Sequence, residues 1–243
     1  MQTTKNNTES LDRSTIQDRD KKYITCLRLV ELVVNREIGS ILSEDYYENL
    51  GRVASFIDRS LDALTLTQKA KLLEDFNSLF AHLIDSENQE RFNALVLQFI
   101  VRNGIDLNYT LSELYAVRTF IQFQKKHQLV SELQSFGKNI ISISIRQELA
   151  ESSAEITALL KQEGQLVIKL LESNLKQFTS NYSGLKKTIN LLTEFEQILN
   201  LGDDFLDVNK DFQKRKLNNR HNVFHRFTIM KLCHIFFFNP DTQ

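Results

Sequence analysis

Apolar residues recur with helical spacing along almost the whole chain from Tyr23 onward, and helix-breaking residues are scarce. The 243 residues include one proline and seven glycines. The ISISI stretch at 141–145 alternates as a strand would, but it has no second strand with which to pair, so we interpret it as helix. Residues 138–178 are too long for one helix, and we expect a break near Ser152 or Gly164. The pattern predicts an all-α fold, a single bundle of roughly seven to nine helices.

Capping residues indicate where several of these helices begin and end. Ser43 is expected to cap one helix and Thr65 or Thr67 the next, because a hydroxyl oxygen accepts a hydrogen bond from the first turn. Gly104 is expected to follow a C-terminus, where the backbone often becomes left-handed. The expected helices cover residues 23–42, 43–64, 65–85, 88–104, 110–137, 138–178 and 183–217.

The two ends of the chain differ in composition from the middle. Residues 1–21 are polar and lack apolar periodicity, so we expect a flexible N-terminal arm, followed by a helical domain over residues 22–217. Residues 218–243 carry three of the five histidines and three consecutive phenylalanines, and we interpret them as an atypical tail. His221 and His225 are one helical turn apart, a spacing that zinc sites use, but no third ligand is evident and we favour a pair of surface histidines.

Charge and hydropathy exclude several classes of protein. The net charge of −1 and the pI of about 6.5 provide no basic excess of the kind that nucleic-acid-binding domains carry. No apolar run approaches the roughly 18–20 residues of a membrane span, and the N-terminal residues lack the apolar core of a signal peptide. Cys26 and Cys233 have no metal-type spacing, and so few cysteines suit a reducing compartment. We expect a cytoplasmic protein without a transmembrane segment or a nucleic-acid partner.

The stretch LGDDFLDVNKDF at 201–212 is the sequence feature that most strongly indicates chemistry. On a helix, Asp203, Asp207 and Asp211 share one face, and Asp204 lies beside them. A solvated acidic face is one interpretation. The acids are, however, interspersed with apolar residues, which places them near the core, where unpaired carboxylates are costly. A divalent cation would relieve that cost, and Mg²⁺ prefers carboxylate oxygen ligands.

The segment DDFLDVNKD resembles the second aspartate-rich motif of the class I isoprenoid synthases, the superfamily of trans-prenyltransferases and terpene synthases. It looks most similar to poorly characterised bacterial class I isoprenoid biosynthesis enzymes. The resemblance implies a helical bundle with a central cavity and a prenyl diphosphate substrate bound through Mg²⁺. It also implies that Asp203, Asp207 and Asp211 hold the metal and that Asp203, Asp204 and Asp207 are catalytic.

A first aspartate-rich motif is expected on an earlier helix. In FIDRSLD at 56–62, Asp58 and Asp62 occupy the outer positions of the family's D-D-x-x-D frame, and Arg59 replaces the middle aspartate. The resemblance makes Asp58 and Asp62 catalytic metal ligands, although an ordinary amphipathic turn would also carry two such acids. A rival first motif, LIDSENQE at 83–90, keeps the spacing less well.

Basic residues at two places match the family's diphosphate contacts. Lys161 lies on the helix before the second motif, although Gly164 stands three residues later instead of completing the family's K-T-G. Lys214 and Arg215 follow the acidic stripe and would contact diphosphate, while Lys214 to Lys216 would also suit a helix C-terminus. A surface position for Lys161 is the alternative interpretation.

The chain departs from the family in having few residues after the second motif, so the bundle would be shortened at its C-terminus. The sequence predicts an Mg²⁺-dependent enzyme that ionises an allylic prenyl diphosphate, for prenyl transfer or terpene synthesis. We expect it to work as a homodimer. Two alternatives remain open. The first is a catalytically impaired relative that binds prenyl diphosphate or acts as a partner subunit, and the second is an unrelated helical interaction protein.

Overall fold

A computed structural model describes residues 5–105 and 109–194 of the chain, and these residues form an all-α bundle without strands. An eighth helix begins at residue 182 and is described as far as residue 194. The ISISI stretch lies within a helix, as predicted. The seven complete helices are α1 (Lys5–Ile38), α2 (Glu44–Asp62), α3 (Leu66–Ile84), α4 (Gln89–Arg102), α5 (Leu111–Lys126), α6 (Val130–Leu149) and α7 (Ser153–Lys176).

The first helix begins much earlier than the sequence pattern predicts. Residues 5–21, which we expected to form an arm, are the first turns of α1, so a helix start at Tyr23 is wrong. Hydrophobic periodicity could not reveal these turns because they are polar. They can extend a helix because the packed part, up to Ile38, supplies the nucleus, and each residue added to an existing helix costs little. Gly39, with a φ of 87°, then ends α1 close to the expected place.

The predicted caps are confirmed where they depend on local hydrogen bonds. Ser43 Oγ accepts from Tyr46 N at 3.3 Å and caps α2. Thr65, and not Thr67, caps α3, because its hydroxyl and the side chain of Gln68 form a reciprocal capping box. Gly104 has a φ of 59° just after α4, as expected of a left-handed C-terminal residue.

The long helix predicted over residues 110–137 is two helices in the structure. α5 ends at Lys126 and α6 begins at Val130, with Gln128 between them at a φ of 59°. This turn lets Leu129 become 2 % exposed, so burial of an apolar side chain offsets the cost of a left-handed glutamine. The break expected near Ser152 or Gly164 occurs at Ser152, whose side chain caps α7.

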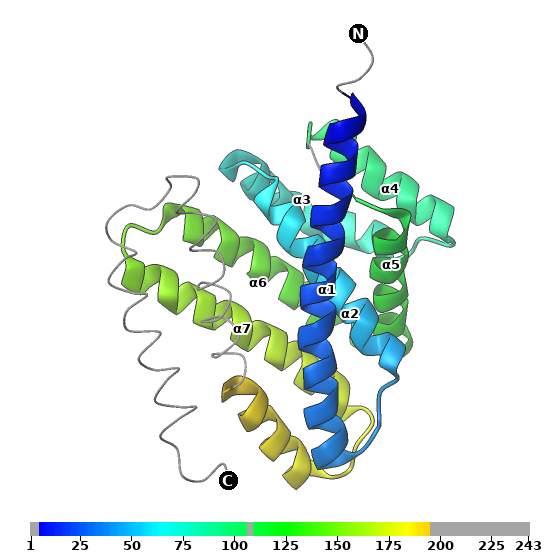
Figure 1. The fold of residues 1–243 in the computed structure, drawn as a ribbon, viewed down its shortest axis with the longest axis vertical. Helices are drawn as coiled ribbons and strands as arrows, with labels where there is room; N and C mark the ends of the chain where they lie inside the picture. The colour runs from blue at the N-terminus through cyan, green and yellow to red at the C-terminus, as the bar shows by residue number, and fades with distance from the viewer. Residues whose placement is uncertain (1–4, 106–108, 195–243) are drawn as a thin grey trace.

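The helices surround a core centred on α2. α2 packs against α1 on one side and α5 on another, α3 packs against α6, and α6 packs against α7. In Figure 1, α1 runs the length of the bundle, with α4 and α5 on its right and the α6–α7 pair on its left. α1 and α2 approach closely at Gly51, where a Cβ would lie 3.0 Å from the backbone of Ile24. No helix in the described part of the chain is long and apolar enough to cross a membrane.

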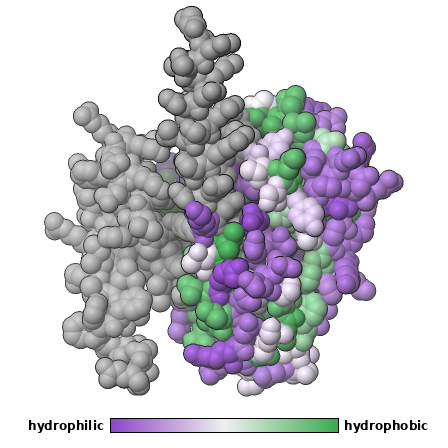
Figure 2. All heavy atoms as spheres, turned by 45° about the vertical axis from the view of Figure 1, so that its right-hand side comes forward, coloured by the Kyte–Doolittle hydropathy of each residue, from purple (hydrophilic) through white to green (hydrophobic). Residues whose placement is uncertain are grey.

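The outer face over α4 and α5 is mixed in polarity. Figure 2 shows separate hydrophobic residues between hydrophilic ones on the coloured part of this face. Leu97 and Val101 of α4 and Leu111 and Tyr115 of α5 are exposed. Single exposed apolar side chains of this kind are normal on protein surfaces. The large apolar cluster of the described residues is the core inside the bundle.

Candidate functional site

Helix α2 carries apolar and acidic residues on different faces. Ile57 and Leu61 lie one helical turn apart and line a cavity between α2, α3, α4, α5 and α6. Asp58 and Asp62 each come one residue after a cavity-lining residue, so their stripe is turned by about 100° around the helix axis. A cavity is therefore present beside α2, but the acidic pair does not lie on the helix face that lines it.

The acidic pair instead lies near enough to Glu163 of α7 for its charges to act on that carboxyl. Burial raises the pKa of the Glu163 carboxyl, and the negative charges of Asp58 and Asp62 raise it further. Gln147 Nε2 of α6 donates to Glu163 Oε2 at 2.9 Å, which acts in the opposite direction on the pKa. The structure thus brings together two predicted residues and one that the sequence reasoning missed. Only the segment KQEG, singled out for its lysine, pointed to this part of α7.

Lys161 lies two residues before Glu163 on the same helix. Two residues correspond to about 200° around an α-helix, so Lys161 projects from a face nearly opposite to that of Glu163. Lys161 is also exposed. The structure therefore gives no support for a position of Lys161 beside Asp58 and Asp62, and it favours the alternative of a surface lysine.

Arg59 is a structural residue that links α2 to α5. Its guanidinium forms an ion pair with Glu113, whose side chain is fully buried. The other carboxylate oxygen, Glu113 Oε2, accepts from Thr110 N at 2.6 Å and Thr110 Oγ1 at 2.9 Å in the capping box of α5. An aspartate at position 59, as in the motif that FIDRSLD resembles, would instead place a second carboxylate close to Glu113.

The rival acidic motif at 83–90 does not form a stripe on one helix. Asp85 follows the end of α3, Glu87 lies in the turn, and Glu90 is in the first turn of α4. All three are exposed, and Asp85 pairs with Lys125 at 3.4 Å. Among the residues that the structure describes, no group of three His, Cys, Asp or Glu side chains is placed to hold a metal ion.

The second aspartate-rich motif lies outside the described residues. The candidate residues concerned are Asp203, Asp204, Asp207, Asp211, Lys214, Arg215, His221 and His225. The described helix that begins at residue 182 precedes them in the chain.

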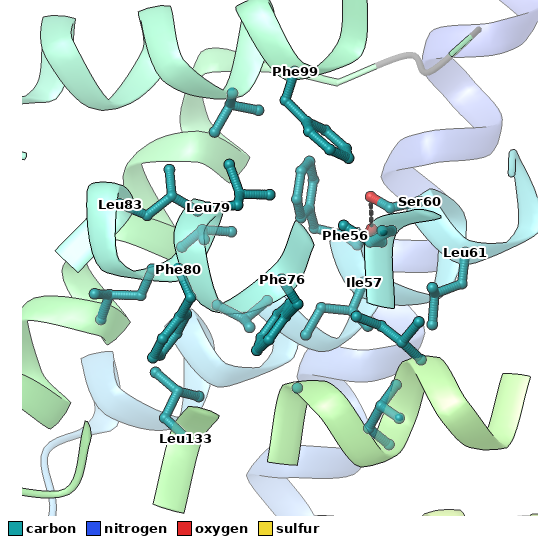
Figure 3. Close-up of a pocket in the computed structure, with 18 of the residues that line it drawn as sticks. Phe56, Ile57, Ser60, Leu61, Phe76, Leu79, Phe80, Leu83, Phe99 and Leu133 are labelled. Atoms are coloured by element: carbon teal, nitrogen blue, oxygen red, sulfur yellow. Dashed lines mark hydrogen bonds between the residues drawn. The ribbon is translucent and has the colours of Figure 1, made fainter. Parts of the chain in front are cut away.

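The cavity beside α2 has a volume of about 220 Å³ and an apolar lining. Figure 3 shows Phe56, Ile57 and Leu61 of α2 around it, with Phe76, Leu79 and Leu83 of α3 and Phe99 of α4. Among the described residues of the lining, Ser60 alone carries a side-chain hydroxyl, and its Oγ donates to Phe56 O at 2.6 Å (Figure 3). The hydroxyl is therefore satisfied by its own helix.

Comparison with known proteins was made at three levels. No family model, curated protein or solved structure matches this chain. The possible chemistry of the site therefore rests on its residues alone. Asp58 and Asp62 offer two carboxylates on one stripe of α2, and an apolar cavity lies on another face of the same helix.

Proposed function

We propose that this protein is an Mg²⁺-dependent class I isoprenoid enzyme that ionises an allylic prenyl diphosphate. The observation that carries the proposal is the one-turn spacing of Asp58 and Asp62 on α2, whose negative charges also act on Glu163 of α7. Carboxylates from facing helices of a bundle are a common way of building a metal site. The all-α fold and the acidic stripe at Asp203 to Asp211 support the same function.

The donor set has the chemistry that Mg²⁺ requires. Asp58 and Asp62 supply hard carboxylate oxygens, and Asp203, Asp207 and Asp211 would supply the remaining protein ligands. When bound, Mg²⁺ would act as a Lewis acid that stabilises the diphosphate leaving group. Lys214 and Arg215 would contact the diphosphate, while Lys161 is a weaker candidate because of its exposed position. Asp204, next to Asp203 in the chain, would be a catalytic residue of the same motif.

The proposal is tested by incubating the full chain with Mg²⁺ and a panel of allylic prenyl diphosphates and measuring pyrophosphate release. Asp58→Asn and Asp62→Asn are expected to lower the rate by about a hundredfold or more, the loss that follows removal of a charged group acting on the leaving group. Asp85→Asn is the matched control, because Asp85 belongs to the rival motif and is exposed. If the rate depends on Asp85 and not on Asp58, the first aspartate-rich motif is the segment 83–90 and not 56–62. If no diphosphate releases pyrophosphate, the proposed enzyme activity is wrong.

The second candidate is a non-catalytic relative that binds prenyl diphosphate or acts as a helical partner subunit. The Arg59–Glu113 ion pair favours it, because a position that is acidic in the family serves here to join α2 to α5. A rise in melting temperature with Mg²⁺ and a prenyl diphosphate, but without pyrophosphate release, would identify this relative.

Two further parts of the proposal concern the oligomeric state and the cellular location of the protein. We expect a homodimer in the cytoplasm. Light scattering coupled to size-exclusion chromatography tests the dimer, for which a mass close to that of the 28.3 kDa chain would be the contrary result.

A further inference from the structure

The cavity beside α2 is a partly enclosed apolar space, and the lining that the structure describes offers no free polar group to a ligand. Its walls come from five helices, and the Ser60 hydroxyl is already bonded to Phe56 O. Protein interiors pack as densely as organic crystals, so a space of about 220 Å³ is a departure from ordinary packing. Cavities of about 150 Å³ that are lined by Leu, Ile and Phe remain dry and bind benzene. This larger apolar cavity should therefore also be able to take up an apolar molecule.

The arrangement of α3 provides both a wall and an opening. α3 packs extensively on α6 and only weakly on α4. Leu79 and Leu83 of α3 and Val96 and Phe99 of α4 line the cavity, yet they retain partial solvent exposure. We take the space between α3 and α4 as the path from solvent into the cavity.

Gly137 of α6 helps to keep the space open. A Cβ at this position would come closer to the ring of Phe76 than real Cβ atoms do. The Phe76 ring thus packs against the backbone of α6 at Gly137, where no side chain intervenes. Any larger residue at 137 would force the ring to shift, and both Phe76 and Gly137 belong to the cavity lining.

We infer that this cavity is a binding site for a small uncharged hydrocarbon, about the size of an alkylbenzene, which enters between α3 and α4. The absence of a charged or hydrogen-bonding group in the described lining excludes recognition of a charged head inside the cavity. The inference does not depend on the proposed enzyme activity, because the stripe of Asp58 and Asp62 lies on another face of α2 and plays no part in the lining.

The test uses n-butylbenzene as the probe with the full chain. Isothermal titration calorimetry measures affinity, and methyl NMR locates the contact. The methyl signals of Leu79 and Leu83 should shift on addition of the probe, whereas those of the exposed Leu32 should not.

Val96→Phe would fill the cavity from α4 and should weaken binding by roughly tenfold or more, which corresponds to about 1.4 kcal/mol. The matched control is Leu97→Phe, which adds the same ring one residue away at a position that is 48 % exposed and should leave affinity unchanged. Gly137→Ala should also weaken binding, since it displaces Phe76.

Three results would overturn the inference. The first is no heat of binding and no shift in the Leu79 and Leu83 methyl signals of the unmodified protein. The second is equal affinity in Val96→Phe and Leu97→Phe. The third is a set of shifted methyl signals confined to exposed residues such as Leu32. If Val96→Phe does not fold, the methyl map of the unmodified chain still decides the question.

Discussion

The Arg59–Glu113 ion pair should make Arg59 one of the most sensitive positions for stability. Arg59→Met removes the cation and leaves the carboxylate of Glu113, which is 0 % exposed, buried without its partner. Breaking a buried ion pair from one side costs about 3–5 kcal/mol. For a chain of this length each kcal/mol lowers the melting temperature by about 2–4 °C, so a fall of about 6–20 °C is expected.

Urea unfolding followed by circular dichroism would measure this free energy in a double-mutant cycle. Glu113→Gln keeps an oxygen for the capping box with Thr110 while removing the charge. The double variant Arg59→Met/Glu113→Gln should therefore be more stable than Arg59→Met alone, because no unpaired charge remains buried. A loss below about 1 kcal/mol in Arg59→Met, or simple additivity in the double variant, would refute the reasoning.

Arg59→Asp introduces the residue type that the resembled isoprenoid motif has at this position and tests the same argument in the opposite direction. It would place two carboxylates together between α2 and α5, so we expect a loss of stability larger than that of Arg59→Met. A stable Arg59→Asp variant with greater Mg²⁺-dependent turnover would mean that Arg59 replaced a catalytic group and that its structural role is secondary.

Two further predictions concern buried polar groups. Because the pKa of Glu163 is raised in the folded protein, its contribution to stability is present below the ordinary carboxyl pKa and is lost as the pH rises through the raised value. Glu163→Gln should therefore be more stable than the unmodified protein at neutral pH but not in acid, and equal urea midpoints at both pH values would contradict this. Asn174→Leu should cost about 1–3 kcal/mol, since it leaves the amide of the fully buried Gln124, which donates to Asn174 Oδ1 at 2.7 Å, without that acceptor. Exposed Asn77→Leu, which removes a similar bond to Gln134, is the control and should be nearly neutral in the same unfolding assay.

Local sequence determined the helical class and most of the helix ends. Ser43, Thr65 and Gly104 could be assigned from residue type alone, because a cap is a contact between neighbours in the chain. The start of α1 and the turn at Gln128 could not be assigned in this way. The first depends on extension from a packed helix, and the second on the burial of Leu129 against distant residues.

Some features of the candidate site could likewise be predicted from the sequence, and others depend on tertiary packing. Sequence spacing alone put Asp58 and Asp62 on one stripe of a helix, because that spacing is a property of the helix itself. Only the tertiary structure decided what the stripe faces. It paired Arg59 with Glu113, brought Glu163 of α7 to the two aspartates, turned Lys161 outward and put the cavity on another face of α2. These outcomes depend on how helices distant in the chain rotate and pack to bury their apolar faces, which no single segment specifies.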